Sequence, residues 1–262
     1  MTSITTTVFF GSNYKVAQSI NRSLPLSGIY VEERGFNCNI YNYAQQQGIN
    51  FHIVTTLDDL NILCQSQPQL AVMYGFWLIM GPIQIQAFEH GIWNIHPGKL
   101  PEYRGRHPIS WALINNEQSI GLCIHRINHQ IDQGTLLSST EIPRDMNDNQ
   151  IDIDKKFETV IEAGLFNEAL SNYTNGVSHE LTAGKYHESL ISKFKEIRPA
   201  EHNSTFVFNL FKSQSTFGGV SVAGTLFTQF HFYNEAMDSH YADGKVFSCL
   251  DGKKVILSSV GI

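Results

Sequence analysis

The sequence predicts an α/β fold, in which a parallel sheet carries helices on both faces, followed by a smaller β-rich region. Two observations support this. Short apolar and β-branched runs alternate with stretches of helical spacing through the first part of the chain, and such alternation is typical of βαβ units. The last part contains Ser/Thr-rich loops and aromatic runs typical of short strands. We therefore expect a core over residues 1–180 and a β-rich appendage over residues 181–262.

The beginning of the chain shows the alternation most clearly. Thr5–Phe10 is a β-branched and aromatic run, and Tyr14–Arg22 has apolar residues at helical spacing, with Gly11 at the turn between them. A G-x-G-x-x-G pattern is absent from this turn, so a dinucleotide-binding fingerprint is not predicted. Further strands are expected at Gly28–Val31, Asn50–Val54 and Leu70–Tyr74, with helices at Tyr41–Gln47 and Leu57–Gln65 between them.

The middle and the end of the chain are less regular. We expect a helix at Pro108–Asn115, a strand at Ile120–Ile127 and a long helix at Asp152–Asn172. Strands are expected in the tail at Phe206–Phe211, Leu226–Tyr233, Lys245–Leu250 and Lys254–Ser259. Asp251-Gly252 is typical of a hairpin turn and joins the last two of these strands.

Composition narrows the class of protein. The chain has 262 residues, of which 42% are hydrophobic and 16% charged, as in a soluble globular protein. Its net charge of −6 argues against a nucleic-acid partner. The four cysteines form no CxxC pair, and the spacing of His125 and His129 falls on a predicted strand and loop, so we expect reduced thiols and no metal. A basic leader and a membrane-length apolar run are both absent, so we expect a cytoplasmic protein.

Three polar residues stand where strands end. Asn94 and His96 project from one face of an extended segment that Pro97 ends, and Asp132 follows on a loop with Gly134. An amide, an imidazole and a carboxylate suit acyl transfer, because they can stabilise an oxyanion and move a proton. No G-x-S-x-G elbow accompanies them. Taken singly, each also fits a structural role: a turn cap, a loop histidine and a turn aspartate.

The surrounding motifs resemble a known family. The run NIHPGKLPEYRGRHPISWALINNEQSIGLCIHRINHQIDQG is similar to the signature of the folate-dependent formyltransferases, which include glycinamide ribonucleotide, methionyl-tRNA and sugar N-formyltransferases. Their pattern is close to N-[IL]-H-P-S-L-L-P-x-Y-R-G, P-x-x-W-A-[IL]-x-N-G-E, G-[VL]-x-[IL]-H and I-D-x-G. Two departures are Gly98-Lys99 in place of Ser-Leu and Asn116 in place of Gly. The resemblance implies a Rossmann-like core with Asn94, His96 and Asp132 as the catalytic trio.

The resemblance also implies a cofactor site. The formyl donor of the family is N10-formyltetrahydrofolate, and its pterin ring binds to the backbone of two loops. The matching residues here are Leu78, Ile79 and Met80 in one loop, and Asn128, His129, Gln130, Ile131 and Asp132 in the other. Arg106 matches a position at the mouth of the site. The residues alone favour the apolar run at 76–80 as the start of a helix packed on the core. Tyr14, Lys15 and Arg104 are candidates for substrate contacts.

Among the branches of the family, the length of the chain and the β-rich character of its last part resemble the sugar N-formyltransferases. The resemblance then implies a nucleotide-linked aminodideoxy sugar as acceptor, with dTDP-4-amino-4,6-dideoxyglucose as first candidate, in O-antigen or lipopolysaccharide synthesis. We expect a homodimer. Three alternatives stay open: a 10-formyltetrahydrofolate hydrolase, a formyltransferase acting on glycinamide ribonucleotide or methionyl-tRNA, and a non-catalytic folate- or nucleotide-binding module.

Overall fold

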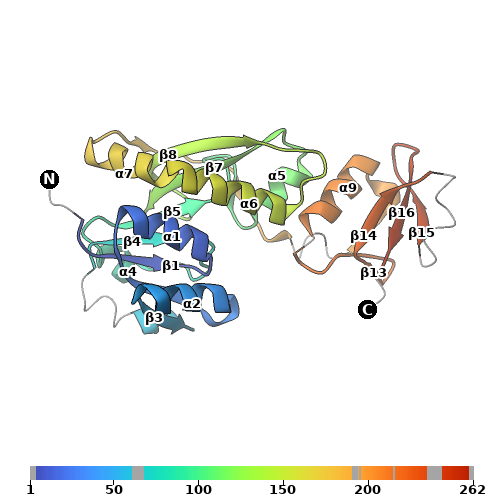
Figure 1. Ribbon diagram of the computed structural model, residues 1–262. Coiled ribbons are helices and arrows are strands. Elements are labelled where there is room, and N and C mark those ends of the chain that lie inside the picture. Colours follow the sequence, from blue (N-terminus) through green and yellow to red (C-terminus); the bar gives the residue numbers. More distant parts are fainter. Residues whose placement is uncertain are drawn as a thin grey trace. The chain divides into compact units, whose positions relative to one another are not determined.

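A computed structural model describes residues 4–60, 68–190, 194, 196–214, 216–234 and 244–259 (Figure 1). The chain forms two compact units that are interleaved in sequence. Unit 1 comprises residues 1–104, 121–141 and 156–185, and unit 2 comprises residues 105–120, 142–155 and 186–262. The domain boundary expected at residue 180 stays a prediction.

The main sheet has eight strands in the order β3-β2-β1-β4-β5-β7-β8-β9. Their bounds are β1 (Thr7–Phe10), β2 (Leu26–Glu32), β3 (Asn50–Val54), β4 (Leu70–Met73), β5 (Ile92–His96), β7 (Ser119–Ile127), β8 (Gly134–Pro143) and β9 (His179–Glu180). The first five strands pair in parallel, so their carboxyl ends meet at one edge. The expected parallel sheet is therefore confirmed for these strands, whereas β7 pairs antiparallel with β5, and β9 antiparallel with β8.

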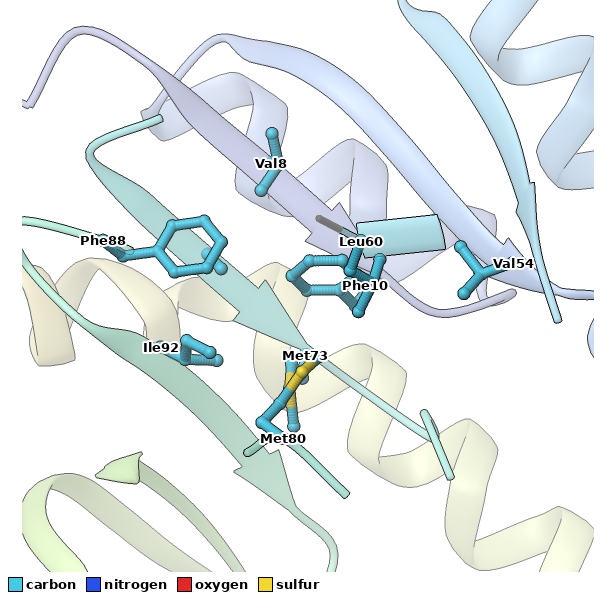
Figure 2. Close-up of a cluster of buried hydrophobic side chains, with 9 residues drawn as sticks. Val8, Phe10, Val54, Leu60, Met73, Met80, Phe88 and Ile92 are labelled. Atoms are coloured by element: carbon cyan, nitrogen blue, oxygen red, sulfur yellow. The ribbon is translucent and has the colours of Figure 1, made fainter. Parts of the chain in front are cut away.

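Alternation along β5 separates the two faces of the sheet. The Trp93 ring contacts the rings of Phe166 and Tyr173 on α7 (Phe166–Thr174), at centroid distances of 6.0 and 5.0 Å. Ile92 points the other way, into a buried apolar cluster (Figure 2). The cluster also contains Val8, Phe10, Val54, Leu60, Ala71, Met73, Met80 and Phe88. Because side chains alternate, Asn94 and His96 lie on the face of this cluster.

In unit 1, α1 (Tyr14–Ser23) and α2 (Cys38–Gln47) follow the predicted pattern, and α4 (Pro82–Gln86) is an additional short helix. α6 (Gln150–Val160) begins within the residues of unit 2, ends within those of unit 1, and leads to α7 through a π-helical segment (Ile161–Leu165). Short 3-10 helices span Glu33–Gly35, Leu57–Leu60 and Pro199–Glu201. The helix predicted at Leu57–Gln65 is thus seen as one turn, and its remainder lies outside the described residues.

The π-helical segment interrupts the long helix predicted at Asp152–Asn172. Gly164 has a φ of 121° within it, so the regular pattern of main-chain hydrogen bonds is broken there. Two buried hydroxyls donate to carbonyls of the segment: Ser19 to Ile161 (3.1 Å) and Ser138 to Leu165 (3.2 Å). These serines stabilise the interruption and tie α1 and β8 to it.

The described residues of unit 2 include two complete α-helices and several short strands. The helices are α5 (Pro108–Ile114) and α9 (Ser204–Ser213), and the strands are β10 (Tyr186–His187), β11 (Glu196–Ile197), β12 (Val220–Val222), β13 (Thr225–Phe227), β14 (Gln229–Phe232), β15 (Lys245–Ser248) and β16 (Lys254–Ser258). β6 (Arg104–Gly105) pairs with β10. The predicted hairpin at Asp251-Gly252 is present, because β15 pairs antiparallel with β16.

Two strand predictions in the tail are wrong in detail. Phe206–Phe211 is not a strand but part of α9, because the Asn203 side chain caps the first turn by accepting from the Phe206 N–H (2.7 Å). Aromatic residues favour strands, but Val207, Leu210 and Phe211 recur at helical spacing and are buried. The run Leu226–Tyr233 contains two strands, β13 and β14, instead of one. No helix among the described residues is both long and apolar enough to span a membrane.

A substitution in the turn after β1 tests how closely the chain is packed at the edge of the sheet. Gly11 has a φ of 146°, and a Cβ there would lie 2.2 Å from the Tyr74 carbonyl oxygen. We expect Gly11→Ala to lower the free energy of unfolding by about 3 kcal/mol, since backbone strain and overpacking add. The matched control is Gly48→Ala, where φ is 66° and no atom lies within 4 Å of the added Cβ, with an expected loss of about 1 kcal/mol. Urea unfolding followed by tryptophan fluorescence measures both, and equal losses would contradict the steric argument.

Candidate active site

Asn94 and His96 stand at the carboxyl end of β5. Both lie on the face of the buried apolar cluster, as the two-residue period requires. His96 is 4% exposed. Its Nε2 lies 2.8 Å from the Tyr103 carbonyl oxygen, and Nδ1 lies 3.5 Å from the Asp132 carboxylate. Both ring nitrogens therefore face acceptors, an arrangement that the doubly protonated imidazolium satisfies.

The contact between His96 and Asp132 is longer than a normal N–H···O hydrogen bond of about 2.7–3.2 Å. Nε2 is engaged by a carbonyl at normal distance, whereas Nδ1 is not committed to the carboxylate. Nδ1 is therefore the ring nitrogen that can hand a proton to a ligand. The carboxylate remains close enough to stabilise the positive charge of the ring.

Asp132 is presented by a tight loop. Its φ is 50°, in the left-handed region that Asp tolerates better than most residues. Gly134 follows with a φ of 106°, and a Cβ there would lie 2.1 Å from the Arg126 carbonyl oxygen. At the start of the loop, the Asn128 side chain accepts from the Gln130 N–H (2.8 Å). These local constraints bring Asp132, which is 36 residues from His96 in sequence (132 − 96), back to β5.

His125 is a fourth member of the site. Antiparallel pairing places it directly opposite Asn94, so both side chains share one face. His125 is fully buried, and burial lowers its pKa from 6.5 to about 4, although the nearby Asp132 charge acts in the opposite direction. Nδ1 lies 3.1 Å from the Gln133 carbonyl oxygen and Nε2 lies 3.3 Å from Asn94 Nδ2.

These contacts fix the state of two side chains. A carbonyl only accepts, so His125 Nδ1 donates to Gln133, and the neutral ring leaves Nε2 as an acceptor. The Asn94 amide must then turn its NH₂ group toward His125. One N–H of Asn94 is used in this way, and the amide has a second N–H to offer.

His125 is not among the site residues predicted from the sequence, where it is considered only for its spacing to His129. The described residues contain no cluster of three or more His, Cys, Asp or Glu side chains suited to a metal ion. A signal was available, because a histidine in the apolar run Leu122–Ile127 must find hydrogen-bond partners once buried. The register with Asn94 could not be read from the sequence.

The apolar run at 76–80 is a loop, and α4 begins only at Pro82. Met80 is buried in the apolar cluster, with Phe76 and Leu78 packed against it. Trp77 and Ile79, by contrast, are 44% and 60% exposed. Core packing thus anchors the loop, while two large apolar side chains face outward.

Asn128 and His129 belong to the second predicted cofactor loop. They line a cavity of about 350 Å³ together with Pro82, Ile85, Gln86, Phe88, Glu89, Gly91, Arg126 and Ile127. Ile131 is 40% exposed. Both predicted cofactor loops therefore have accessible surface, and their role in binding stays a prediction.

The predicted substrate contacts have partners of their own within the chain. Lys15 Nζ donates to Glu158 (2.9 Å), which also accepts from Asn13 (2.8 Å), and Tyr14 is the first residue of α1. The Arg104 guanidinium contacts main-chain carbonyls of unit 1. Arg106 belongs to unit 2 and is exposed, with its N–H donating to the His187 carbonyl (2.9 Å).

Comparison with known proteins supports the resemblance. Residues 55–169 match the model of the formyl transferase family, which confirms the similarity predicted from the sequence. Methionyl-tRNA formyltransferase of Prochlorococcus marinus (strain MIT 9312) is 28% identical over 151 residues, 55% of this chain and 46% of that protein. A second such enzyme, from Thermotoga neapolitana, is 31% identical over 44% of this chain and 33% of that protein. The matches to these curated relatives span less than half of their length.

Solved structures match a larger part of the chain. WlaRD, a sugar 3N-formyl transferase solved in the presence of dTDP and 5-N-formyl-THF, matches with a TM-score of 0.70 and 18% identity over 100% of both chains. The N-formyltransferase of Helicobacter canadensis, in complex with folinic acid and dTDP-3-aminofucose, matches with a TM-score of 0.72 and 17% identity over 98% of this chain and 99% of that one. At this identity the likeness shows a shared fold.

The buried neutral His125 makes stability depend on pH. Its folded pKa of about 4 lies below the ordinary 6.5, so between these values the unfolded state binds more protons and stability falls as the pH is lowered. We expect the free energy of unfolding to fall by about 3 kcal/mol from pH 7 to pH 4, at about 1.4 kcal/mol per pKa unit. Urea titrations across this range measure it.

The matched variants are His125→Asn and, as control, His179→Asn at an exposed position on β9. Only His125→Asn should flatten the dependence between pH 6.5 and pH 4. If the slopes of wild type and His125→Asn were parallel, His125 would not be the group that titrates.

Proposed function

We propose that the protein, whose residues 55–169 match the formyl transferase family, transfers a formyl group from N10-formyltetrahydrofolate to the amino group of a nucleotide-linked aminodideoxy sugar. The observation that carries the proposal is the arrangement of Asn94, His96 and Asp132. A half-buried amide and a buried imidazole share one face of a strand end, and the carboxylate lies 3.5 Å from the imidazole. Hydrogen-bond donors fixed in this way are suited to stabilise charge that develops on an acyl oxygen.

The chemistry assigns one role to each of these residues. N10-formyltetrahydrofolate supplies the formyl group. As an amine attacks the formyl carbon, negative charge builds on the formyl oxygen, and the second N–H of Asn94 and Nδ1–H of His96 donate to it. Asp132 stabilises the imidazolium and, with His96, conducts the proton from the amine to the departing nitrogen.

The two predicted cofactor loops fit a flat heterocycle. Trp77 and Ile79 expose apolar surface at 44% and 60% of their area, although they lie in a loop beside a buried core. Ile131 exposes 40% on the other predicted loop. Sites for such ligands combine apolar walls with a few backbone polar groups. Leu78–Met80 and Asn128–Ile131 are therefore the residues that we assign to the pterin.

The acceptor is proposed at two levels of detail. WlaRD and the Helicobacter canadensis enzyme, which share the fold over nearly the whole chain, were solved with dTDP and with dTDP-3-aminofucose, and this supports a dTDP-linked aminosugar. Within that class, dTDP-4-amino-4,6-dideoxyglucose is our first candidate and the 3-amino sugars are the second. A role in O-antigen or lipopolysaccharide synthesis, and a homodimer, complete the proposal.

Methionyl-tRNA is the competing acceptor, because the curated relatives include enzymes with that name. The matches to these enzymes cover 42–55% of this chain. A tRNA acceptor would require surplus positive charge, and the net charge of this chain is −6. We therefore place the sugar acceptor first.

An acceptor panel tests the proposed activity. The purified protein is incubated with N10-formyltetrahydrofolate and dTDP-4-amino-4,6-dideoxyglucose, a dTDP-3-amino sugar, a GDP-linked aminosugar, glycinamide ribonucleotide or initiator tRNA. Mass spectrometry should show one added formyl group on a dTDP-linked sugar. Release of tetrahydrofolate with no formylated acceptor would instead identify a hydrolase, and formylation of tRNA alone would overturn the sugar assignment.

Removal of the amide tests the role of Asn94. We expect Asn94→Ala to lower kcat by about 100- to 1,000-fold, the usual cost of losing one donor to a developing oxyanion, with little change in KM. The control is Asn175→Ala, an exposed asparagine at the end of α7, which should retain full activity. Steady-state kinetics on the accepted sugar measures both. A change in KM alone would mean that Asn94 only binds substrate.

A further inference from the structure

The half-buried Arg104 side chain makes several hydrogen bonds to the loop that carries Asp132. Its Nε and Nη2 both donate to the Ile131 carbonyl, at 3.0 and 2.7 Å, and Nη1 donates to the Gly184 carbonyl at 3.2 Å. With its amide oxygen turned toward the guanidinium, Gln133 also accepts from Nη2 (2.9 Å) and Nη1 (3.0 Å). The residues on both sides of Asp132 are therefore held by one side chain.

The main chain next to Arg104 contacts His96, the residue that faces Asp132. The Tyr103 carbonyl, which belongs to the preceding residue, faces His96 Nε2 at 2.8 Å. The Arg104 N–H donates to the Lys185 carbonyl (3.2 Å), which fixes the backbone at this point. One dipeptide, Tyr103-Arg104, thus contacts both the imidazole and the loop that carries the carboxylate.

The loop needs such support. Asp132 adopts a left-handed conformation, which costs free energy for Asp as well, although less than for most other residues. Inside the loop, the main-chain contact from the Gln133 N–H to the Gln130 carbonyl is 3.2 Å long, and Ile131 is 40% exposed. Apolar packing contributes little here, so a charge-assisted contact to the adjacent carbonyl is an effective restraint.

We propose that Arg104 is a positioning residue, which holds the Ile131 carbonyl and thereby presents the Asp132 carboxylate to His96. The inference rests on the proposed function for its effect on catalysis, but the restraint itself is a property of the free protein. Arginine suits the position because its planar fork donates to several acceptors at once. A lysine ammonium is a single point of charge and could not hold Ile131, Gln133 and Gly184 together.

Kinetics distinguishes this role from direct contact with substrate. We expect Arg104→Gln to lower kcat about 100-fold, as displacements near 1 Å can do, while KM for donor and acceptor stays within about twofold. Arg104→Lys should lie between Arg104→Gln and wild type, because one contact to Ile131 can be rebuilt. The control is Arg198→Gln, whose side chain is 80% exposed and pairs only at the surface with Glu201; its kcat should equal that of wild type.

Hydrogen exchange tests the restraint without substrate. The amides of Gln130 and Gln133 are hydrogen-bonded within the loop and should exchange about tenfold faster in Arg104→Gln than in wild type. Amides of β1 should be unchanged, which shows that the variant is folded.

Three results would overturn either the positioning role of Arg104 or the proposed function. A raised KM for the nucleotide sugar, with normal kcat and unchanged exchange, would make Arg104 a substrate contact and overturn the proposal. Normal kcat with unchanged exchange would overturn it as well. A wild-type protein that formylates none of the acceptors would overturn the proposed function, and the exchange rates alone would then confirm or reject the restraint.

Discussion

The antiparallel pairing of β7 with β5 is the contact on which the candidate site depends. Its register sets His125 opposite Asn94 and Cys123 opposite His96. A slip of one residue would turn His125 to the other face of the sheet, where Trp93 meets α7. The parallel strands supply an edge at which side chains can gather, and the antiparallel strand β7 supplies the neighbour that fixes Asn94.

The same face holds two histidines with different hydrogen-bonding surroundings. His125 donates to a carbonyl through Nδ1 and accepts from an amide through Nε2, so its neutral form is satisfied. His96 faces a carbonyl and a carboxylate, so its charged form is satisfied. The ring centroids are 6.3 Å apart. Acceptors and donors around each ring, more than burial alone, thus separate a structural imidazole from one that can deliver a proton.

Much of the fold could be predicted because its signals are local. The strand ends at Phe10 and Val54 and the helix start at Tyr14 agree with the structure, since alternation and capping depend on neighbours in sequence. Phe206–Phe211 was assigned wrongly because an aromatic run suits either a strand or a buried helix, and the cap at Asn203 decides between them. The motif located Asn94, His96 and Asp132, but their geometry depends on contacts distant in sequence.

His125 and Arg104 show why the rest of the candidate site could not be predicted from the sequence. The partner of His125 is set by strand register, and register is a property of the paired strands, not of either one. The sequence predicts Arg104 only as a candidate for a substrate contact, and the folded chain shows that Ile131 and Gly184 offer it their carbonyls. Polar side chains that contact main-chain carbonyls leave no pattern in the sequence, because every residue has a carbonyl.

The contact from Arg104 to Gly184 has a consequence for the order in which the chain folds. Residues 104 and 184 are 80 apart in sequence, and β9 precedes the second of them at the end of the main sheet. Closing so long a loop carries an entropic cost that is recovered only when its ends have docked. The arrangement of Asp132 beside His96 is therefore completed late in folding. A nascent chain that has built β1 to β8 still lacks Gly184, one of the acceptors of the Arg104 guanidinium.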